Sequence, residues 1–120
     1  MCTQNVFECL RTKANEAVAN NPGIEQVLAI RTAAGRTYLI LNDQVTAGNY
    51  EAEQHFVTML SKSEDTHVLY VVALWRDCEP DLPSFHFRSQ LVLLNPNNMD
   101  TLILMRDMNG YHGRALGSTL

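Results

Sequence analysis

Two carboxylates and an imidazole lie close together in the segment NYEAEQHF, which spans Asn49 to Phe56. Such a density of titratable side chains is typical of metal sites and of acid/base sites. On a helix with roughly 100° per residue, Glu51 and His55 fall together on the solvent side, where such a pair usually forms a weak surface interaction. Glu53 falls at the flank of the apolar arc, which comprises Ala52, Phe56, Met59 and Leu60. The cluster therefore reduces to one candidate binding residue, Glu53.

A carboxylate in the position of Glu53 is expected to be partly removed from water and to need a partner. The candidate partners are arginines of the expected strands, namely Arg31, Arg76, Arg88 and Arg106. With such a partner, Glu53 is either half of a structural ion pair or an acid with a perturbed pKa in a cleft or an interface. The sequence leaves both interpretations open.

The run Glu51-Ala52-Glu53 resembles the His-x-Glu helix start of the zinc-dependent cytidine and adenosine deaminases. In that family a later Pro-Cys-x-x-Cys completes the zinc site. This chain departs from the pattern, because position 51 is Glu and because Asp77-Cys78-Glu79-Pro80 holds a single cysteine. The resemblance therefore implies a degenerate relative without a hydrolytic zinc centre, and no metal or other cofactor is predicted.

A second group of carboxylates, Asp77, Glu79 and Asp81, alternates along a segment that also contains Pro80 and Pro83. Prolines interrupt regular structure, so an exposed loop is predicted here. The three carboxylates either only solvate this loop or form a fixed acidic surface for a basic partner protein. The spacing lacks the glycine and the distal glutamate of a calcium-binding loop.

Alternating side chains in Phe85 to Leu94 predict a half-buried strand. Phe85 and Phe87 would face the core, with His86 and Arg88 on the opposite side of the strand. Because Val92 and Leu94 continue that second side in apolar form, a dimer or partner interface is a reasonable hypothesis there.

Periodicity and breakers give the expected elements. Helices are predicted at residues 3–19 and 50–61, and strands at 25–32, 36–41, 67–75, 85–94 and 101–108. The order α-β-β-α-β-β-β contains two predicted hairpins and one central strand, while residues 109–120 show no period. We therefore expect one α+β domain over residues 1–120, a two-layer sandwich with a mostly antiparallel five-stranded sheet and its helices on one face. A first helix followed by Asn21-Pro22-Gly23-Ile24-Glu25, and then Gly35-Arg36 in a hairpin, also resembles the roadblock group of small dimeric scaffold domains.

Composition excludes several classes of function. The 120 residues include thirteen Asp and Glu against nine Lys and Arg, a net charge of −4, which argues against nucleic-acid binding. Three cysteines, Cys2, Cys9 and Cys78, form no CxxC pair, so a reducing compartment is expected. Without a leader sequence or a membrane span, the sequence predicts a cytoplasmic protein.

These observations favour a small acidic interaction domain without catalytic activity, of the inhibitor, immunity-protein, chaperone or adaptor type. It would bind a protein partner, possibly a basic one, or associate with itself. The alternative is a small enzyme or ligand-binding domain that uses Glu53 with a strand arginine, with His86 or His112 as a further candidate residue. A degenerate deaminase-like protein is one form of this alternative.

Overall fold

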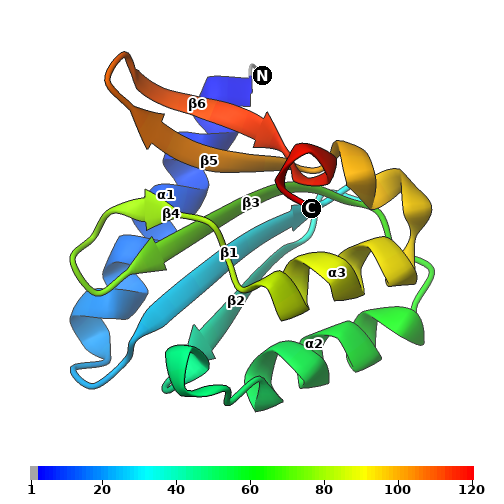
Figure 1. The fold of residues 1–120 in the computed structure, drawn as a ribbon, viewed down its shortest axis with the longest axis horizontal. Coiled ribbons are helices and arrows are strands. Elements are labelled where there is room, and N and C mark those ends of the chain that lie inside the picture. Colours follow the sequence, from blue (N-terminus) through cyan, green and yellow to red (C-terminus); the bar gives the residue numbers. More distant parts are fainter. Residues whose placement is uncertain (1–2) are drawn as a thin grey trace.

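A computed structural model describes the backbone of residues 3–120 and the side chains from Val6 onward (Figure 1). Cys2 lies outside the described residues. The helices are α1 (Thr3–Asn20), α2 (Glu51–Ser61) and α3 (Phe85–Leu94), with short 3-10 helices η1 (Val45–Ala47), η2 (Pro96–Asp100) and η3 (Leu116–Thr119). The strands are β1 (Gln26–Thr32), β2 (Thr37–Asn42), β3 (Val68–Trp75), β4 (Pro80–Asp81), β5 (Leu102–Asp107) and β6 (Gly110–Ala115). Within residues 3–120, no helix is both long and apolar enough to cross a bilayer.

The strands form one sheet in the order β2-β1-β3-β5-β6, and the two-residue β4 pairs with β3. The pairs β1–β2, β1–β3, β3–β4 and β5–β6 are antiparallel, whereas β3 and β5 run parallel. The predicted α+β class is therefore confirmed. The sheet, which was predicted to be mostly antiparallel, is mixed, because its β3–β5 pair is parallel. Helix α3 lies in the connection between the two parallel strands, which a tight turn cannot join.

Alternate residues of the central strands enter two different cores. Leu28 and Val71 pack with Phe56 and Phe87 of α2 and α3, while Val27 packs with residues of α1 on the other side of the sheet. Figure 1 shows α2 and α3 in front of the sheet and α1 behind it. The sandwich of sheet and helices is thus present, but α1 covers the second face, so the helices are not confined to one face as predicted.

The segment 85–94 is a helix, so the predicted strand is wrong. The side chains of Phe87 and Leu91, four residues apart, are fully buried, whereas Phe85 is 62% exposed and Leu93 is 78% exposed. On a strand all four of these residues would face the same side, whereas on a helix Phe87 and Leu91 share a side that Phe85 and Leu93 do not. Leu94 is partly buried against the core of α2 and α3, and the alternating strand face that carried the dimer hypothesis does not exist.

The C-terminal segment, predicted to be irregular, supplies the fifth long strand. β5 and β6 form a hairpin in which Asp107 lies opposite Gly110, and Gly110 has a φ of 109°. Glycine adopts such a φ without a steric penalty. The second hairpin is therefore β5–β6, and the predicted pairing of residues 85–94 with 101–108 is wrong.

Candidate functional site

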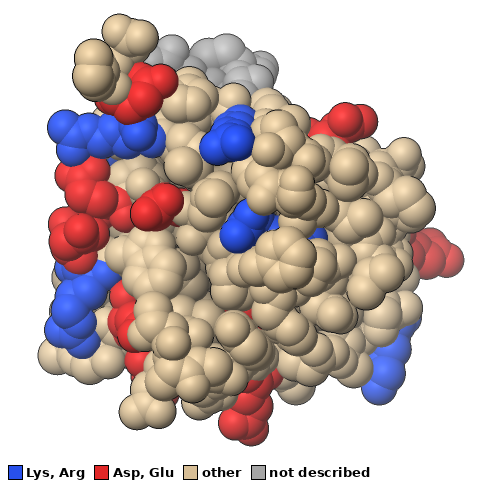
Figure 2. Space-filling model, in the orientation of Figure 1, with Lys and Arg blue, Asp and Glu red and all other residues tan. Residues whose placement is uncertain are grey.

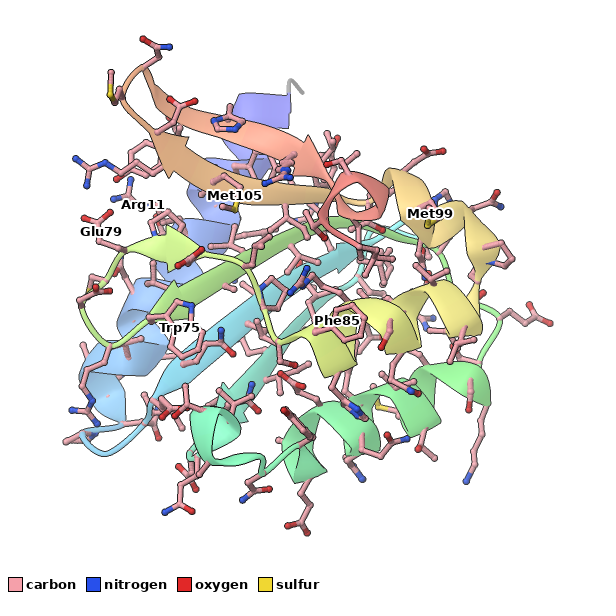
Figure 3. All side chains as sticks on the ribbon, in the orientation of Figure 1. Arg11, Trp75, Glu79, Phe85, Met99 and Met105 are labelled. Carbon is pink, nitrogen blue, oxygen red and sulfur yellow. The ribbon has the colours of Figure 1, made fainter. Side chains whose placement is uncertain are left out.

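Three polar side chains form a row across one end of the sheet, on the face covered by α2 and α3. Gln26 of β1 lies opposite both Asn42 of β2 and Trp75 of β3. Gln26 begins its strand and Asn42 and Trp75 end theirs, and each shares a face with apolar residues of the same strand, because side chains on a strand alternate between the two faces. Figure 3 shows Trp75 in front of the sheet, on the side of α2 and α3. We call Gln26, Asn42 and Trp75 the polar row.

Glu53, in the first turn of α2, lies against this row and is fully buried. Its Oε2 accepts a hydrogen bond from Asn42 Nδ2 at 2.9 Å, and its Oε1 accepts one from Ser84 Oγ at 2.9 Å. Asn42 Nδ2 also donates to Gln26 Oε1 at 3.0 Å. The predicted arginine partner is therefore wrong, because an amide and a hydroxyl bind the carboxylate.

Burial raises the pKa of the Glu53 carboxyl above its ordinary value, because the charged form loses its hydration. The hydrogen bonds from Ser84 and Asn42, and after them the charge of His86, act in the opposite direction. The net direction is upward, since neutral donors only partly replace water around a buried carboxylate.

Ser84 connects Glu53 to the start of α3. As the N-cap residue its Oγ accepts a hydrogen bond from Phe87 N at 3.0 Å, while the same hydroxyl donates to Glu53. Serine is among the preferred N-cap residues because its side chain satisfies a free N–H of the first turn. A single hydroxyl therefore both begins the helix and orients the carboxylate.

The first residues of α2 and α3 are also joined by an aromatic stack. The ring of Tyr50, which immediately precedes α2, lies 4.5 Å from the His86 ring with an angle of 15° between their planes. His86, one of the predicted binding residues, therefore lies beside the Glu53 site and on a helix.

Four buried polar atoms at this end of the sheet have no hydrogen-bond partner among the described residues. They are Gln26 Nε2, Asn42 Oδ1, Trp75 Nε1 and His86 Nε2. Buried polar atoms are nearly always paired, so a group of unpaired ones indicates a place where water or a ligand completes the hydrogen bonding.

A groove of about 620 Å³ between β2 and α2 reaches the polar row at Asn42. Tyr38 and Phe56, whose rings meet edge to face at 5.4 Å, contribute its aromatic part. The carboxylates of Asp43 and Glu51 also line it. Glu51 is exposed, as the helical spacing predicted.

The other predicted binding residues lie away from Glu53. Glu79 pairs with Arg106 of β5 at 2.8 Å on the surface, and Asp77 Oδ1 accepts from the Glu79 backbone N–H at 3.0 Å. Asp81 belongs to β4 and is exposed. Arg88 extends from α3 toward η3, where its Nη1 donates to Thr119 O at 2.7 Å. The structure thus brings together Glu53 and His86, but not the acidic loop or Arg88.

The residues around Glu53 do not fit the zinc site of the deaminases. The segment that matches the spacing of Pro-Cys-x-x-Cys and faces Glu53 is Pro83-Ser84-Phe85-His86-Phe87, not the segment around Cys78. Ser84 Oγ already bonds Glu53 and Phe87 N, and Phe87 offers only carbon. Within the described part of the chain, no three His, Cys, Asp or Glu side chains are grouped as metal ligands. Tetrahedral zinc needs such N, O or S donors, and this segment does not contain the two cysteines of the deaminase motif.

Sequence reasoning missed the polar row, Tyr50 and Ser84. A usable signal was present, because Asn42 and Gln26 are amides at the ends of otherwise apolar strands. A second signal was that the segment from Pro83 to Phe87 has the spacing of the deaminase Pro-Cys-x-x-Cys motif.

Solved structures with the same fold are known. The chain superposes on cytidine deaminase from Mycobacterium tuberculosis with a TM-score of 0.66 and 19% identity, over 95% of this chain and 93% of that one. For the cytidine deaminase from Mycobacterium leprae the TM-score is 0.63 and the identity 16%, over 95% and 96% of the chains. For the cytidine deaminase from Burkholderia pseudomallei the TM-score is 0.65 and the identity 15%, over 100% of this chain and 97% of that one. No protein-family model matches the sequence, and no curated protein is significantly similar to it.

The chain therefore has the cytidine deaminase fold. This finding overturns the interpretation favoured by the sequence, a non-catalytic protein-interaction domain, because the structural relatives named here are enzymes of one fold. It favours the alternative, a protein with a deaminase-like fold, while a site at Glu53 stays a prediction. The basic partner of the acidic loop stays a prediction.

Proposed function

We propose that this chain is a degenerate deaminase-like domain that binds a small amino-substituted ring in the groove between β2 and α2. The observation that carries the proposal is the buried Glu53 network, which holds Asn42 in place while Asn42 Oδ1 lacks a partner. An acceptor fixed at the end of a groove selects a ligand that donates a hydrogen bond.

The chemistry of the groove indicates which ligand fits. Asn42 Oδ1 and the carboxylates of Asp43 and Glu51 are all acceptors, so they favour amino groups over carbonyl groups. The rings of Tyr38 and Phe56 favour a flat apolar body between those polar ends. Cytidine, the substrate named for the structural relatives, combines an amino group with a flat ring.

In this proposal Glu53 is a positioning residue and not a hydrolytic base. Its carboxylate fixes the Asn42 amide, and the Asn42 carbonyl contacts the ligand. No step passes through a metal, since Ser84 and Phe87 stand where a deaminase has cysteines.

Isothermal titration with cytidine and uridine tests the proposal, because uridine carries a carbonyl in place of the amino group. We expect cytidine to bind about tenfold more tightly than uridine, as an unmatched polar group in a binding site costs at least that factor. Asn42→Ala should abolish the preference, whereas Asn97→Ala, at an exposed position on η2, should keep it.

Two outcomes would contradict the proposal. Equal binding of cytidine and uridine would remove the role of Asn42 Oδ1. Conversion of cytidine to uridine at a rate that rises with added zinc and disappears with a chelator would show a working metal site.

We also propose a reducing compartment such as the cytoplasm, supported by the exposed, unpaired thiols of Cys9 and Cys78.

A further inference from the structure

Two arginines, Arg88 of α3 and Arg114 of β6, lie close together beside η3. Burial, and in second place the positive charge of Arg114, holds the pKa of Arg88 below its ordinary value. Like charges repel unless something compensates them. In a chain with a net charge of −4, such a pair is unexpected. We call Arg88 and Arg114 the arginine pair.

Backbone oxygens, not carboxylates, hold the arginine pair. Arg88 Nε donates to Pro83 O at 3.0 Å and its Nη1 to Thr119 O at 2.7 Å. Arg114 Nε donates to Ser118 Oγ at 3.1 Å and its Nη2 to Ser118 O at 3.0 Å. Among residues 3–120 the ion pairs are Arg106 with Glu79 and His112 with Asp107, so neither member of the pair meets a carboxylate.

These contacts fix the two guanidinium groups and leave donors free. Arg88 Nη2 and Arg114 Nη1 take part in none of the hydrogen bonds found among the described residues. A neutral carbonyl orients a guanidinium but leaves its charge uncompensated. The pair is therefore prepared for an anion that two arginines contact together.

The hydrogen-bond partners of the arginine pair are uncharged. Figure 2 shows Lys and Arg atoms near the middle of the face, within uncharged surface, while Asp and Glu atoms gather mainly along the edges. The Phe85 ring is 62% exposed and lies 5.7 Å from Arg88 Cζ, and Figure 3 shows it at the exposed start of α3. An exposed aromatic ring beside fixed cations provides a flat apolar contact next to the charge.

The geometry points to a second binding site, at the arginine pair and Phe85, for the phosphate group of an organic phosphate monoester whose ring contacts Phe85. A phosphate presents several acceptor oxygens and about two negative charges, which matches two guanidinium groups. The site uses the outer side of α3 and η3, so it is independent of the groove between β2 and α2.

Titration followed by amide NMR shifts, at constant ionic strength, tests this site with three probes. These are phenyl phosphate, which carries both ring and phosphate, inorganic phosphate, and benzyl alcohol. We expect phenyl phosphate to bind more tightly than inorganic phosphate, and benzyl alcohol not to bind. The shifts should centre on Phe85, Arg114 and Ser118.

Variants separate the contributions. Arg114→Gln should raise the Kd of phenyl phosphate about tenfold, as expected for losing one charge-assisted hydrogen bond. Phe85→Ala should reduce the affinity for phenyl phosphate to that for inorganic phosphate. The matched control is Arg36→Gln, because Arg36 is exposed in the β1–β2 turn, and it should leave the Kd unchanged.

Binding that weakens equally in Arg36→Gln and Arg114→Gln would overturn the site, since it would reflect net charge alone. Amide NMR shifts of equal size at every arginine would also overturn the site. Equal affinity for phenyl phosphate and inorganic phosphate, unaffected by Phe85→Ala, would overturn the assignment to a ring-bearing ester.

Discussion

Glu53 has the chemistry of an acid held away from water, with two neutral donors on its oxygens. The hydroxyl of Ser84 and the amide of Asn42 satisfy its two oxygens but supply no formal positive charge. Burial therefore decides the direction of its pKa, which is upward. A carboxyl with a raised pKa makes stability depend on pH in the opposite direction from the usual salt-bridged carboxylate.

The direction of this pH dependence follows from the number of protons that the folded and unfolded states bind. Between the ordinary carboxyl pKa and the raised native pKa, folded protein holds the Glu53 proton more often than unfolded chain does. The free energy of unfolding therefore falls as pH rises through this window, by about 1.4 kcal/mol for each unit of pKa elevation. The contribution is complete below the ordinary carboxyl pKa and is lost as pH rises through the native one.

Glu53→Gln removes this titration while keeping a side chain of the same size. We expect the variant to gain stability relative to the wild-type protein as pH rises from about 4 to about 8, because only the wild-type protein must ionise a buried group. Urea unfolding across that range measures the difference. Glu51→Gln, at an exposed position on the same helix, is the control. A difference that does not change with pH would contradict the raised pKa.

Helical spacing alone placed Glu53 at the core boundary, yet the sequence could not identify its partners. Asn42 and Ser84 are 11 and 31 residues away in the chain, and their proximity depends on the ends of β2 and α3 meeting. Charge complementarity favours an arginine as the partner of a carboxylate. A buried arginine would also lose its hydration, which adds a second desolvation cost to that of Glu53.

At the scale of elements, α3 decides where the site forms. Its sequence alternates like a strand, yet Ser84 caps its first turn, and Phe87 and Leu91 both enter the core. The local pattern favours a strand, because Phe85, Phe87, Leu91 and Leu93 are spaced by two or four residues. Over so short a segment, only packing distinguishes the strand period of 2 from the helix period of 3.6. β6 was missed for the opposite reason, since its glycine-rich sequence lacks apolar alternation, although Asn109-Gly110 is a known hairpin signal.

Ser84→Ala should destabilise the protein by about 1–2 kcal/mol, the usual cost of a lost N-cap. The loss should couple to Glu53, whose Oε1 loses its donor. In a double-mutant cycle with Glu53→Gln, we expect a coupling energy of at least about 0.5 kcal/mol. Chemical denaturation measures all four proteins.

Ser89→Ala provides the matched control on the same helix. Its hydroxyl donates only to His86 O, at 3.0 Å, within the helix. We expect a change within about 0.5 kcal/mol and no coupling to Glu53→Gln. Equal effects of the two serine substitutions would show that the N-cap and the Glu53 contact contribute nothing specific.

At the scale of the whole molecule, the parallel pairing of β3 and β5 must be held without a hairpin. Helix α3 and η2 connect the two strands, and Asn98 of η2, which is fully buried, fixes this connection. Its Oδ1 accepts from Val68 N at 2.8 Å, and its Nδ2 donates to Thr66 O at 3.1 Å and Leu91 O at 2.8 Å. One amide therefore joins the start of β3 to the end of α3.

Asn98→Ala should lower the free energy of unfolding by about 2–4 kcal/mol, because it leaves buried backbone groups without partners. The neighbouring Asn97 is exposed, so Asn97→Ala should change it by less than about 0.5 kcal/mol. Hydrogen exchange should show the loss of protection concentrated at the Val68 amide and the last turn of α3 (Phe85–Leu94). If Asn98→Ala were as stable as Asn97→Ala, the hydrogen bonds of the Asn98 amide to Val68, Thr66 and Leu91 would contribute nothing to stability.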